Sequence, residues 1–408
     1  MTYRSSARLF MFVTLALFAM GYVFRYFFLS HFLGDNIALP PEYLDWQNVN
    51  IGPLTSAMMI CTAIFGTYFI IHIATTRSVD RQPTDYIKLP FWVFVAFGLF
   101  VIASLVVRAR YGAALGQEAA ADAGFFFGTL NYRIQSDLIP PLILLIMEVA
   151  WRHQDKAQYY LGIAMLAAFF LILSAITTSK AGMVFFLAQL IMLMYMTGQN
   201  ILKYPVRISL GVLAGVLAFI IGSQLRAQAL GAGDSAIWVS LKDGHIADTL
   251  FQVVGLIANR IPGVEGLALS CGIDCSTLPG FHFPSLARSA ADIFTYDIIR
   301  VQWANDFRSP GLIGGAVLLT GLWGGVAMVL GFLFAAKSIC SAMDRYRFSA
   351  AASAAFVYGV LRIMMEGAWY WVDFVTMLAG VIATEAVSRL LIARKSSRSD
   401  SELTPQPA

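Results

Sequence analysis

The sequence predicts an all-α integral membrane protein with about ten transmembrane helices. Of its 408 residues, 58% are hydrophobic and only 13% are charged, whereas soluble domains carry roughly 25% charged residues. The apolar blocks are about 17–25 residues long, which is enough to cross roughly 30 Å of hydrocarbon as a helix. They are continuous rather than alternating, which favours helices over the strands of a barrel.

The spans follow the apolar blocks in chain order. They are expected at 9–29, 52–74, 90–107, 136–151, 159–177, 182–198, 208–225, 310–336, 349–367 and 370–392. The block after Arg8 is too long for the hydrophobic region of a signal peptide, so no cleavable signal is expected. Residues 1–225 therefore hold helices one to seven, and residues 310–392 hold helices eight to ten.

Basic residues set the predicted topology. Alternate loops carry Arg4/Arg8, Arg77/Arg81/Lys88, Arg152/Lys156, Lys203/Arg207, Lys337/Arg345/Arg347 and Arg394/Lys395/Arg398. The positive-inside rule places these loops and both termini in the cytoplasm. The polar tail at 393–408 is expected to be disordered.

The opposite, periplasmic side also carries cations, and these call for an anionic ligand. They are Arg108, Arg110, Arg133, Lys180, Arg226, Lys242, Arg260, Arg288, Arg300 and Arg308. Two loops on this side are long, at about 108–135 and at 226–309. Helical spacing of apolar residues predicts two amphipathic helices in the larger loop, joined by a segment rich in Gly and Pro.

Some ionisable residues fall within the spans. Arg362 precedes Glu366 by four residues, so both lie on one face of a helix and can pair. This pair is either a structural salt bridge or part of a substrate site, because charges at membrane depth usually face the bundle interior or a wet cavity. Arg25 and Glu148 are expected to pair or to extend to the interface.

Arginine at the outer ends of spans suggests a site for phosphate, because its planar fork grips phosphate oxygens in two places. Arg226 follows span seven, Arg260 ends an amphipathic segment, and Arg308 precedes span eight. Each one alone is compatible with an interfacial anchor. Together with Lys180, at the tight turn between spans five and six, they favour an anion site that would receive the diphosphate of a lipid carrier.

Motifs for other chemistries are absent. The sequence has no HExxH, GxSxG, Gly-rich phosphate loop or Asp-x-Asp pair. A metal-independent reaction without a cofactor is therefore expected. His282, in an aromatic turn, is a candidate base near neutral pH, with a purely structural role as the alternative. Cys271 and Cys275 are expected to form a small disulfide outside the membrane.

Two stretches resemble bacterial O-antigen (Wzy-type) polymerases. "ILSAITTSKAGMVFFLAQL" is similar to the Ser-Arg-Gly turn between adjacent spans of that family, and "RSPGLIGGAVLLTGLWGGVAMVLGFLFA" is similar to its late span. The layout of spans and the large outer loop also match. Lys180 stands where the family usually has arginine, and Gly315 stands where it often has glutamate.

The resemblance implies a GT-C-like fold in the inner membrane and glycosyl transfer at its periplasmic face. A growing glycan on undecaprenyl diphosphate would move onto a newly flipped lipid-linked repeat, as part of O-antigen, capsule or exopolysaccharide synthesis. Lys180, Arg226, Arg260 and Arg308, with Arg362 as a further candidate, would bind the diphosphate. His282 or Asp306 would act as base. A flippase and a chain-length regulator are the expected protein partners, and no nucleic acid is expected.

Two alternative functions remain open. An O-antigen ligase shares this architecture but transfers the finished glycan to lipid A core. Ligases tend to carry a histidine-rich stretch before the late span, where this sequence reads "WANDFRSPG". A lipid-linked oligosaccharide transporter would also need cations near phosphate, but no internal repeat of the kind common in transporters is visible.

Overall fold

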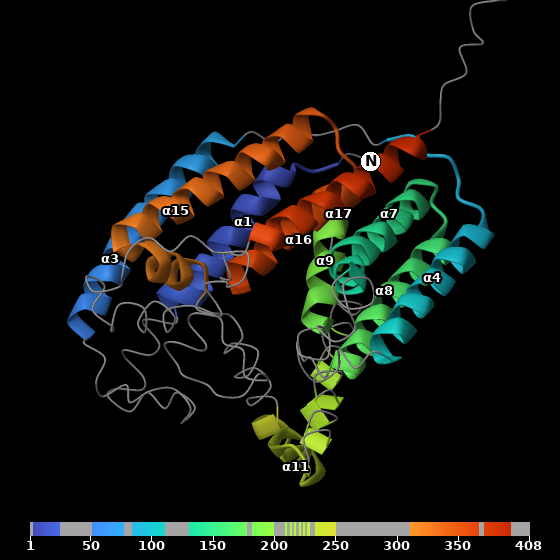
Figure 1. Cartoon of the computed structure of the whole chain (residues 1–408), viewed down its shortest axis with the longest axis horizontal. Coiled ribbons are helices and arrows are strands. Elements are labelled where there is room, and N and C mark those ends of the chain that lie inside the picture. Colours follow the sequence, from blue (N-terminus) through green and yellow to red (C-terminus); the bar gives the residue numbers. More distant parts are fainter. Residues whose placement is uncertain are drawn as a thin grey trace, which may run out of the picture.

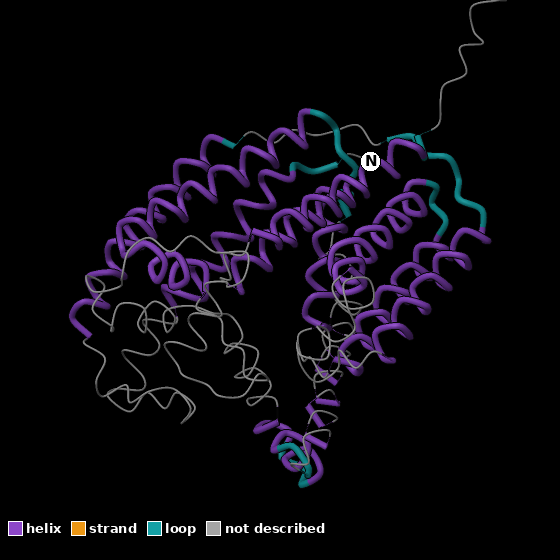
Figure 2. Tube along the Cα trace, viewed as in Figure 1, coloured by secondary structure: helices purple, strands orange, loops and turns teal. Residues whose placement is uncertain are grey.

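The structure is a computed structural model of the chain (Figure 1). It describes residues 3–24, 51–76, 84–110, 130–177, 182–199, 233–249, 311–366 and 371–392, with scattered positions between 209 and 228. Every regular element in these ranges is a helix (Figure 2), and one isolated β-bridge joins Tyr86 to Ile392. The prediction of an all-α protein is confirmed.

The helices follow the predicted order, with bounds that differ in places. They are α1 (Ser6–Phe18), η1 (Ala19–Phe24), α3 (Ile51–Thr75), α4 (Phe91–Arg110), α6 (Asn131–Arg133), η4 (Ile134–Leu138), α7 (Ile139–Arg152), α8 (Lys156–Thr177), α9 (Gly182–Met196), α11 (Ala236–Lys242), α15 (Gly311–Arg345), α16 (Ala350–Glu366) and α17 (Trp371–Leu390). Six helical stretches within the described ranges are long and apolar enough to cross a membrane. The protein is therefore membrane-embedded, while the count of ten spans stays a prediction.

The bundle has two ends. The near end is where α1 and α16 begin and where α7, α15 and α17 finish; the far end is where α4 and α16 finish and α17 begins. In Figure 1 the N-terminus marks the near end, α3 and α15 form one edge of the bundle, and α4 and α8 form the other. Loops predicted to share the cytoplasmic side meet at the near end, as the Arg152–Asp85 pair at 2.7 Å and the Lys88–Asp155 pair at 3.3 Å show.

The start of α1 is fastened to the end of α15 by one carboxylate. Asp344 accepts hydrogen bonds from the Ser5 hydroxyl at 2.6 Å, the Ser6 hydroxyl at 2.7 Å, the Ser6 N–H at 2.9 Å and the Ala7 N–H at 3.2 Å. The first N–H groups of a helix have no partner within the helix. A buried acceptor at that position therefore satisfies them and is favoured by the helix dipole.

The start of α16 is held in the same way by two glutamates. Glu385 accepts from the Ser349 N–H at 2.8 Å, and Glu148 accepts from the Ala351 N–H at 2.8 Å and from the Tyr86 hydroxyl at 3.1 Å. The prediction that Glu148 pairs with a cation or extends to the interface is wrong. Glu148 is fully buried, and its carboxylate is stabilised by a backbone N–H and a tyrosine hydroxyl instead of by a cation.

α16 is the central helix of the bundle. It packs against α1, α7, α9, α15 and α17, and Ala350, Ala351, Ala352 and Ala354 are completely buried. Small side chains let neighbouring helices approach closely in a membrane protein. The position of α16 is thus fixed on several sides, including that of its last turns at the far end.

α15 is not the single straight span that was predicted at 310–336. Gly321 has non-helical backbone angles (φ 73°, ψ 175°), which a residue with a side chain rarely adopts. The chain folds back there, so that a methyl group on Gly325 would lie 2.7 Å from the backbone nitrogen of Val317. A short buried arm therefore precedes a longer limb, 322–345, which extends about 36 Å at 1.5 Å per residue.

The first amphipathic helix of the large loop is shorter than its periodicity predicted. α11 ends at Lys242, and Gly244 has a φ of 77°, so the helix stops at an Asp-Gly turn. The apolar residues Ile237 and Ile220 pack together, and Lys242 pairs with Asp234 at 2.7 Å. Figure 1 places α11 beyond the far end of the bundle.

Candidate functional site

Most of the predicted site residues lie outside the described part of the chain. These are Lys180, Arg226, Arg260, His282, Asp306 and Arg308, and the pair Cys271 and Cys275. Their predicted roles stay predictions. Arg362 is the predicted site residue that the structure describes, so the site is built outward from it.

Arg362 forms an ion pair between helices. It lies on α16, is 8% exposed, and its Nη1 atom is 3.1 Å from Oδ1 of Asp137 on η4. The sequence had suggested Glu366 as its partner, but that side chain is not among those described. Spacing along one helix could not identify Asp137, because the pair joins two segments more than 200 residues apart in sequence.

A second pair makes this a cluster of four. Arg133 of α6 places Nη1 at 2.6 Å from Oδ1 of Asp373, in the first turn of α17, and at 3.9 Å from Oδ2 of Asp137. The four residues Arg133, Asp137, Arg362 and Asp373 are called the ion cluster below. Its two positive and two negative charges cancel, which is how buried charges are usually accommodated.

Two prolines shape the segment that carries Asp137. The predicted span began at 136, whereas the helical stretch begins at Asn131 and passes through the π-helix η4 into α7. Pro140 and Pro141 are the second and third residues of α7, and proline has no N–H to donate to the carbonyl four residues earlier. The helix can widen there, and such π segments occur frequently at functional sites.

α17 fits closely against this widened turn. A methyl group on Gly380 would lie only 2.0 Å from the backbone oxygen of Asp137, so only glycine permits the approach. Asp137 is thus held by its own π segment and by α17. The ion cluster is consequently built on a rigid frame rather than on a loop.

α4 contributes a third arginine next to the ion cluster. The guanidinium carbon of Arg108 lies 5.0 Å from the ring centroid of Tyr132, and that of Arg133 lies 5.3 Å from the same centroid. The two carbons are therefore within about 10 Å of each other, where two unit charges repel by about 1.7 kcal/mol at an effective dielectric of about 20. The aspartates of the ion cluster offset this repulsion for Arg133.

Hydrogen bonds fasten α4 to the same segment. The Ser104 hydroxyl donates to Oδ1 of Asn131 at 2.9 Å, and Gln135 donates to the Ser104 carbonyl at 2.8 Å. Ser104 is one helical turn before Arg108, so these bonds fix the base from which the arginine side chain extends. The far end thus has a preorganised set of cations.

Several polar atoms at this end lack hydrogen-bond partners within the described residues. They include Nε of Arg108, Nε of Arg133 and Oε1 of Gln135, all of which are buried. Native proteins leave few buried polar atoms unsatisfied, and such atoms often mark a functional or ligand-dependent site. Among the described residues, no group of three or more His, Cys, Asp or Glu side chains could hold a metal ion.

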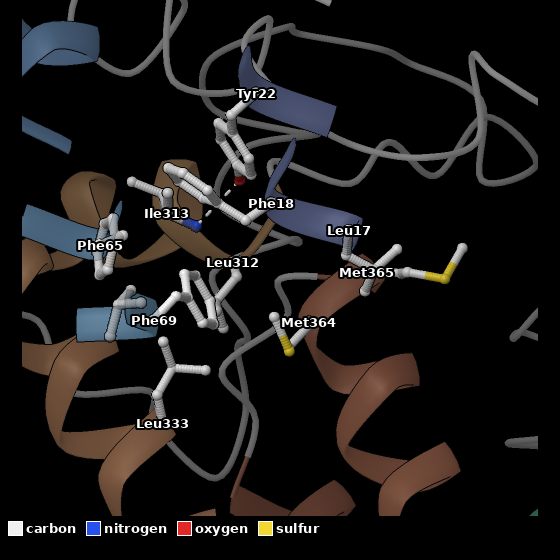
Figure 3. Close-up of a pocket in the computed structure, with 11 residues that line it drawn as sticks. Leu17, Phe18, Tyr22, Phe65, Phe69, Leu312, Ile313, Leu333, Met364 and Met365 are labelled. Carbon is white, nitrogen blue, oxygen red and sulfur yellow. Dashed lines mark hydrogen bonds between the residues drawn. The ribbon is translucent and has the colours of Figure 1, made fainter. Parts of the chain in front are cut away.

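An apolar pocket lies elsewhere in the bundle, among α1, η1, α3, α15 and α16 (Figure 3). Its cavity volume is about 30 Å³ and it is partly open to the outside, and Phe65 and Phe69 lie next to Phe18 there. Its one polar group, the Tyr22 hydroxyl, accepts a hydrogen bond from the Ile313 N–H at 3.2 Å. Arg362, the predicted phosphate-binding residue that the structure describes, does not line this pocket.

The pocket and the ion cluster use adjoining faces of α16. Met364 and Met365 line the pocket, and at 100° per residue they lie about 160° and 60° around the helix from Arg362. None of the described residues that line the apolar pocket is a cation. The anion chemistry of the described residues therefore belongs to the ion cluster and to Arg108.

Sequence reasoning missed the two aspartates of the cluster. Asp137 and Asp373 both lie inside apolar spans, where an acidic residue is itself a signal of function or pairing. Arg133 precedes Asp137 by four residues, a spacing that predicts contact on a helix. It was assigned to the outer loop because the span was predicted to begin at 136.

The chain matches no protein-family model, no curated protein and no solved structure. Its function is therefore inferred from the site and from the sequence motifs.

Proposed function

We propose that this chain polymerises lipid-linked oligosaccharide repeat units at the outer face of the bacterial inner membrane. Its substrates would be two molecules of undecaprenyl-diphosphate-linked oligosaccharide. The proposal includes the full set of ten spans in a GT-C-like arrangement, with the far end of the bundle facing the periplasm. Its products would be O-antigen or a related surface polysaccharide.

One observation supports the proposal most. Arginines from α4, α6 and α16, far apart in sequence, lie together at the end of the bundle that charge distribution predicts to be outside. Transfer of a lipid-linked glycan needs cations at the outer membrane–water interface, because the diphosphate of a membrane-anchored carrier lies there. The sequence resemblance to Wzy-type polymerases also implies glycosyl transfer at the periplasmic side.

The proposed reaction is a simple displacement. The hydroxyl oxygen of the acceptor sugar attacks the anomeric carbon of the growing chain, and the bond from that carbon to the diphosphate oxygen breaks. The bonding pair leaves with the carrier diphosphate, and the hydroxyl proton passes to a base. No metal, nucleotide or oxidant is needed for this balance.

The protein groups would serve two tasks. Lys180, Arg226, Arg260 and Arg308 stabilise the charge that develops on the departing diphosphate, since positioned cations are worth most in a water-poor site. His282 or Asp306 accepts the proton. Arg362, which is paired with Asp137, holds α16 and η4 together and keeps the neighbouring cations in place.

Glycan chain length tests the proposal. Cells that lack the gene should show lipopolysaccharide with a single repeat on a gel, and the wild-type gene should restore the ladder. Arg226→Ala and Arg260→Ala should shorten or abolish the ladder with protein still present in the membrane. Loss of all attached O-chain would indicate a ligase instead, and an unchanged ladder would contradict both.

A departure from the family pattern offers a finer test. Lys180→Arg restores the planar fork at the tight turn, so this variant should retain or increase chain extension. Lys180→Ala should reduce it. Transfer by purified protein in detergent would exclude transport as the whole activity, because no membrane barrier is then present.

A further inference from the structure

Arg108 differs from the other described arginines at the far end. Arg133 and Arg362 each have a carboxylate partner in the ion cluster. Arg108 has no carboxylate partner among the described residues. Its guanidinium carbon lies over the Tyr132 ring, 5.0 Å from the ring centroid. Among the half-buried or buried arginines described at this end, Arg108 is the one whose charge no described carboxylate compensates.

Its environment is not that of an arginine extended into water. Arg108 is half-buried, and its Nε atom is buried without a hydrogen-bond acceptor in the described ranges. Arg110, two residues later on α4, is exposed. An interfacial anchor keeps its charged head in water, as Arg110 can, whereas part of the Arg108 head has been taken out of water.

The position of Arg108 is also fixed by hydrogen bonds of α4 and by the Tyr132 ring. The bonds from Ser104 to Asn131 and Gln135 attach α4 to the α6–η4 segment. The guanidinium carbons of Arg108 and Arg133 lie 5.0 Å and 5.3 Å from the centroid of the Tyr132 ring, so this one ring contacts both arginines. A guanidinium held on an aromatic ring loses less freedom when it binds a ligand.

We infer that Arg108, positioned by Tyr132, is a phosphate-binding residue for the diphosphate of the lipid-linked substrate. The planar fork offers donors to two phosphate oxygens, and the anion relieves the repulsion between Arg108 and Arg133. This inference rests on the proposed function for the identity of the lipid. The shared chemistry, a phosphate at the membrane interface, also describes an anionic phospholipid headgroup, which the experiment separates.

Binding to the purified full-length protein tests the inference. The probe is undecaprenyl diphosphate, with undecaprenol as the phosphate-free control. Arg108→Ala should weaken binding of the diphosphate lipid by tenfold or more, and Arg108→Lys should fall between, because it keeps the charge and loses the fork. Arg110→Ala removes the same charge from the same helix end and should change affinity by less than about twofold, as expected of an exposed charge that is screened by salt.

Tyr132 provides the second pair of variants. Tyr132→Phe keeps the ring and should bind like the wild type, whereas Tyr132→Leu removes the ring that positions Arg108 and should weaken binding. If Arg108→Ala fails to fold, as judged by gel filtration and thermal unfolding, Arg108→Gln retains donors without charge and takes its place. A purely structural role would lower stability and leave the difference between diphosphate lipid and undecaprenol intact.

The outcomes separate this inference from the proposed function. Unchanged affinity in Arg108→Ala overturns the inference, and so does wild-type protein that binds both probes equally. Repeating the measurement in nanodiscs of phosphatidylcholine, with and without phosphatidylglycerol, identifies the source of the phosphate. If Arg108→Ala lowers affinity for phosphatidylglycerol alone, the inference is wrong. The proposed function is judged apart from all of these, by the glycan ladder of cells that lack the gene.

Discussion

The two ends of the bundle treat buried charge differently. At the near end, Asp344, Glu148 and Glu385 each accept hydrogen bonds from the backbone N–H groups of a helix start. At the far end, Arg133, Asp137, Arg362 and Asp373 face one another, and buried atoms of Arg108, Arg133 and Gln135 have no partner in the described residues. Among the described residues, the buried atoms without a partner at the near end belong to neutral side chains, such as Trp151 Nε1 and Ser353 Oγ, whereas those at the far end include the guanidinium nitrogens of Arg108 and Arg133.

The difference teaches which end is structural and which is chemical. Asp344, Glu148 and Glu385 each have a structural role, because each satisfies N–H groups at a buried helix start. The far-end arginines exceed what the described acidic residues require. Substitutions at the near end should therefore change stability alone, while those at the far end should divide into residues that hold the frame and residues that bind.

The largest effect is expected for Arg362→Ala. Removing one partner of a buried ion pair leaves the other charge uncompensated, and such changes cost about 3–5 kcal/mol. Thermal unfolding of the purified protein in detergent measures the loss. The double variant Arg362→Ala, Asp137→Ala removes both charges and should recover part of it. A double variant no more stable than the single would show that the pair itself is not the source.

Asp344→Ala should destabilise the near end by about 3 kcal/mol, because it leaves two N–H groups and the Ser5 hydroxyl without this acceptor, at about 1 kcal/mol for each lost bond. The Ser6 hydroxyl still donates to the Cys340 carbonyl at 2.9 Å. The same unfolding experiment reports the loss of stability. Asp243→Ala, at an exposed turn after α11, is the matched control and should be nearly neutral. Equal effects of the two changes would contradict the structural role given to the near end.

Gly380→Ala should cost about 1–3 kcal/mol, the usual range for inserting a methyl group into a packed interface. The added carbon would meet the Asp137 carbonyl at 2.0 Å, so α17 or η4 must shift. Gly331→Ala is the control, because nothing lies within 4 Å of its methyl position. Because the ion cluster would shift, Gly380→Ala should also weaken binding of the diphosphate lipid. The near-end variant Asp344→Ala should not, when binding is measured for the molecules that remain folded.

The smallest effect concerns pH at the near end. The Gln158 backbone N–H, as the largest cause, holds the pKa of Asp155 below its ordinary value of 3.8. A carboxyl with a lowered pKa stabilises the fold above that ordinary value, and the contribution is lost as the pH falls through the folded-state pKa. Asp155→Asn should therefore be less stable than the wild type at pH 6, and the two should converge once the pH falls below the folded-state pKa of Asp155. A gap that widens with acid would be the wrong sign.

Hydropathy and charge predicted much of the fold from the sequence. The all-α class and the grouping of Arg152, Lys88 and their neighbours at one end follow from composition and from the alternation of basic loops. The start of the helix at Asn131 did not, because the apolar pattern placed the start of that span at 136. The reversal at Gly321 was missed for a similar reason, since hydropathy is the same on both sides of a turn.

The site was harder to predict than the fold. Arg362 was recognised as an intramembrane charge, but its partner comes from a segment that periodicity within α16 cannot reveal. Arg108 and Arg133 were both noted as outer cations, and only the packing of α4 against α6 brings them to one tyrosine. Ion pairs and aromatic contacts between helices depend on rotation and depth, which a single sequence does not specify.

The bond between Ser6 and Asp344 has a consequence for how the protein is made. Ribosomes add about 5–20 residues per second, so α1 leaves the ribosome roughly 20 to 70 s before its acceptor, 338 residues away in sequence, is synthesised. During that interval α1 lies in the membrane without the hydrogen bonds that Asp344 accepts from its first turn. Biogenesis should therefore finish with the docking of α1, and truncation before Asp344 should leave a chain that the cell's quality-control proteases recognise.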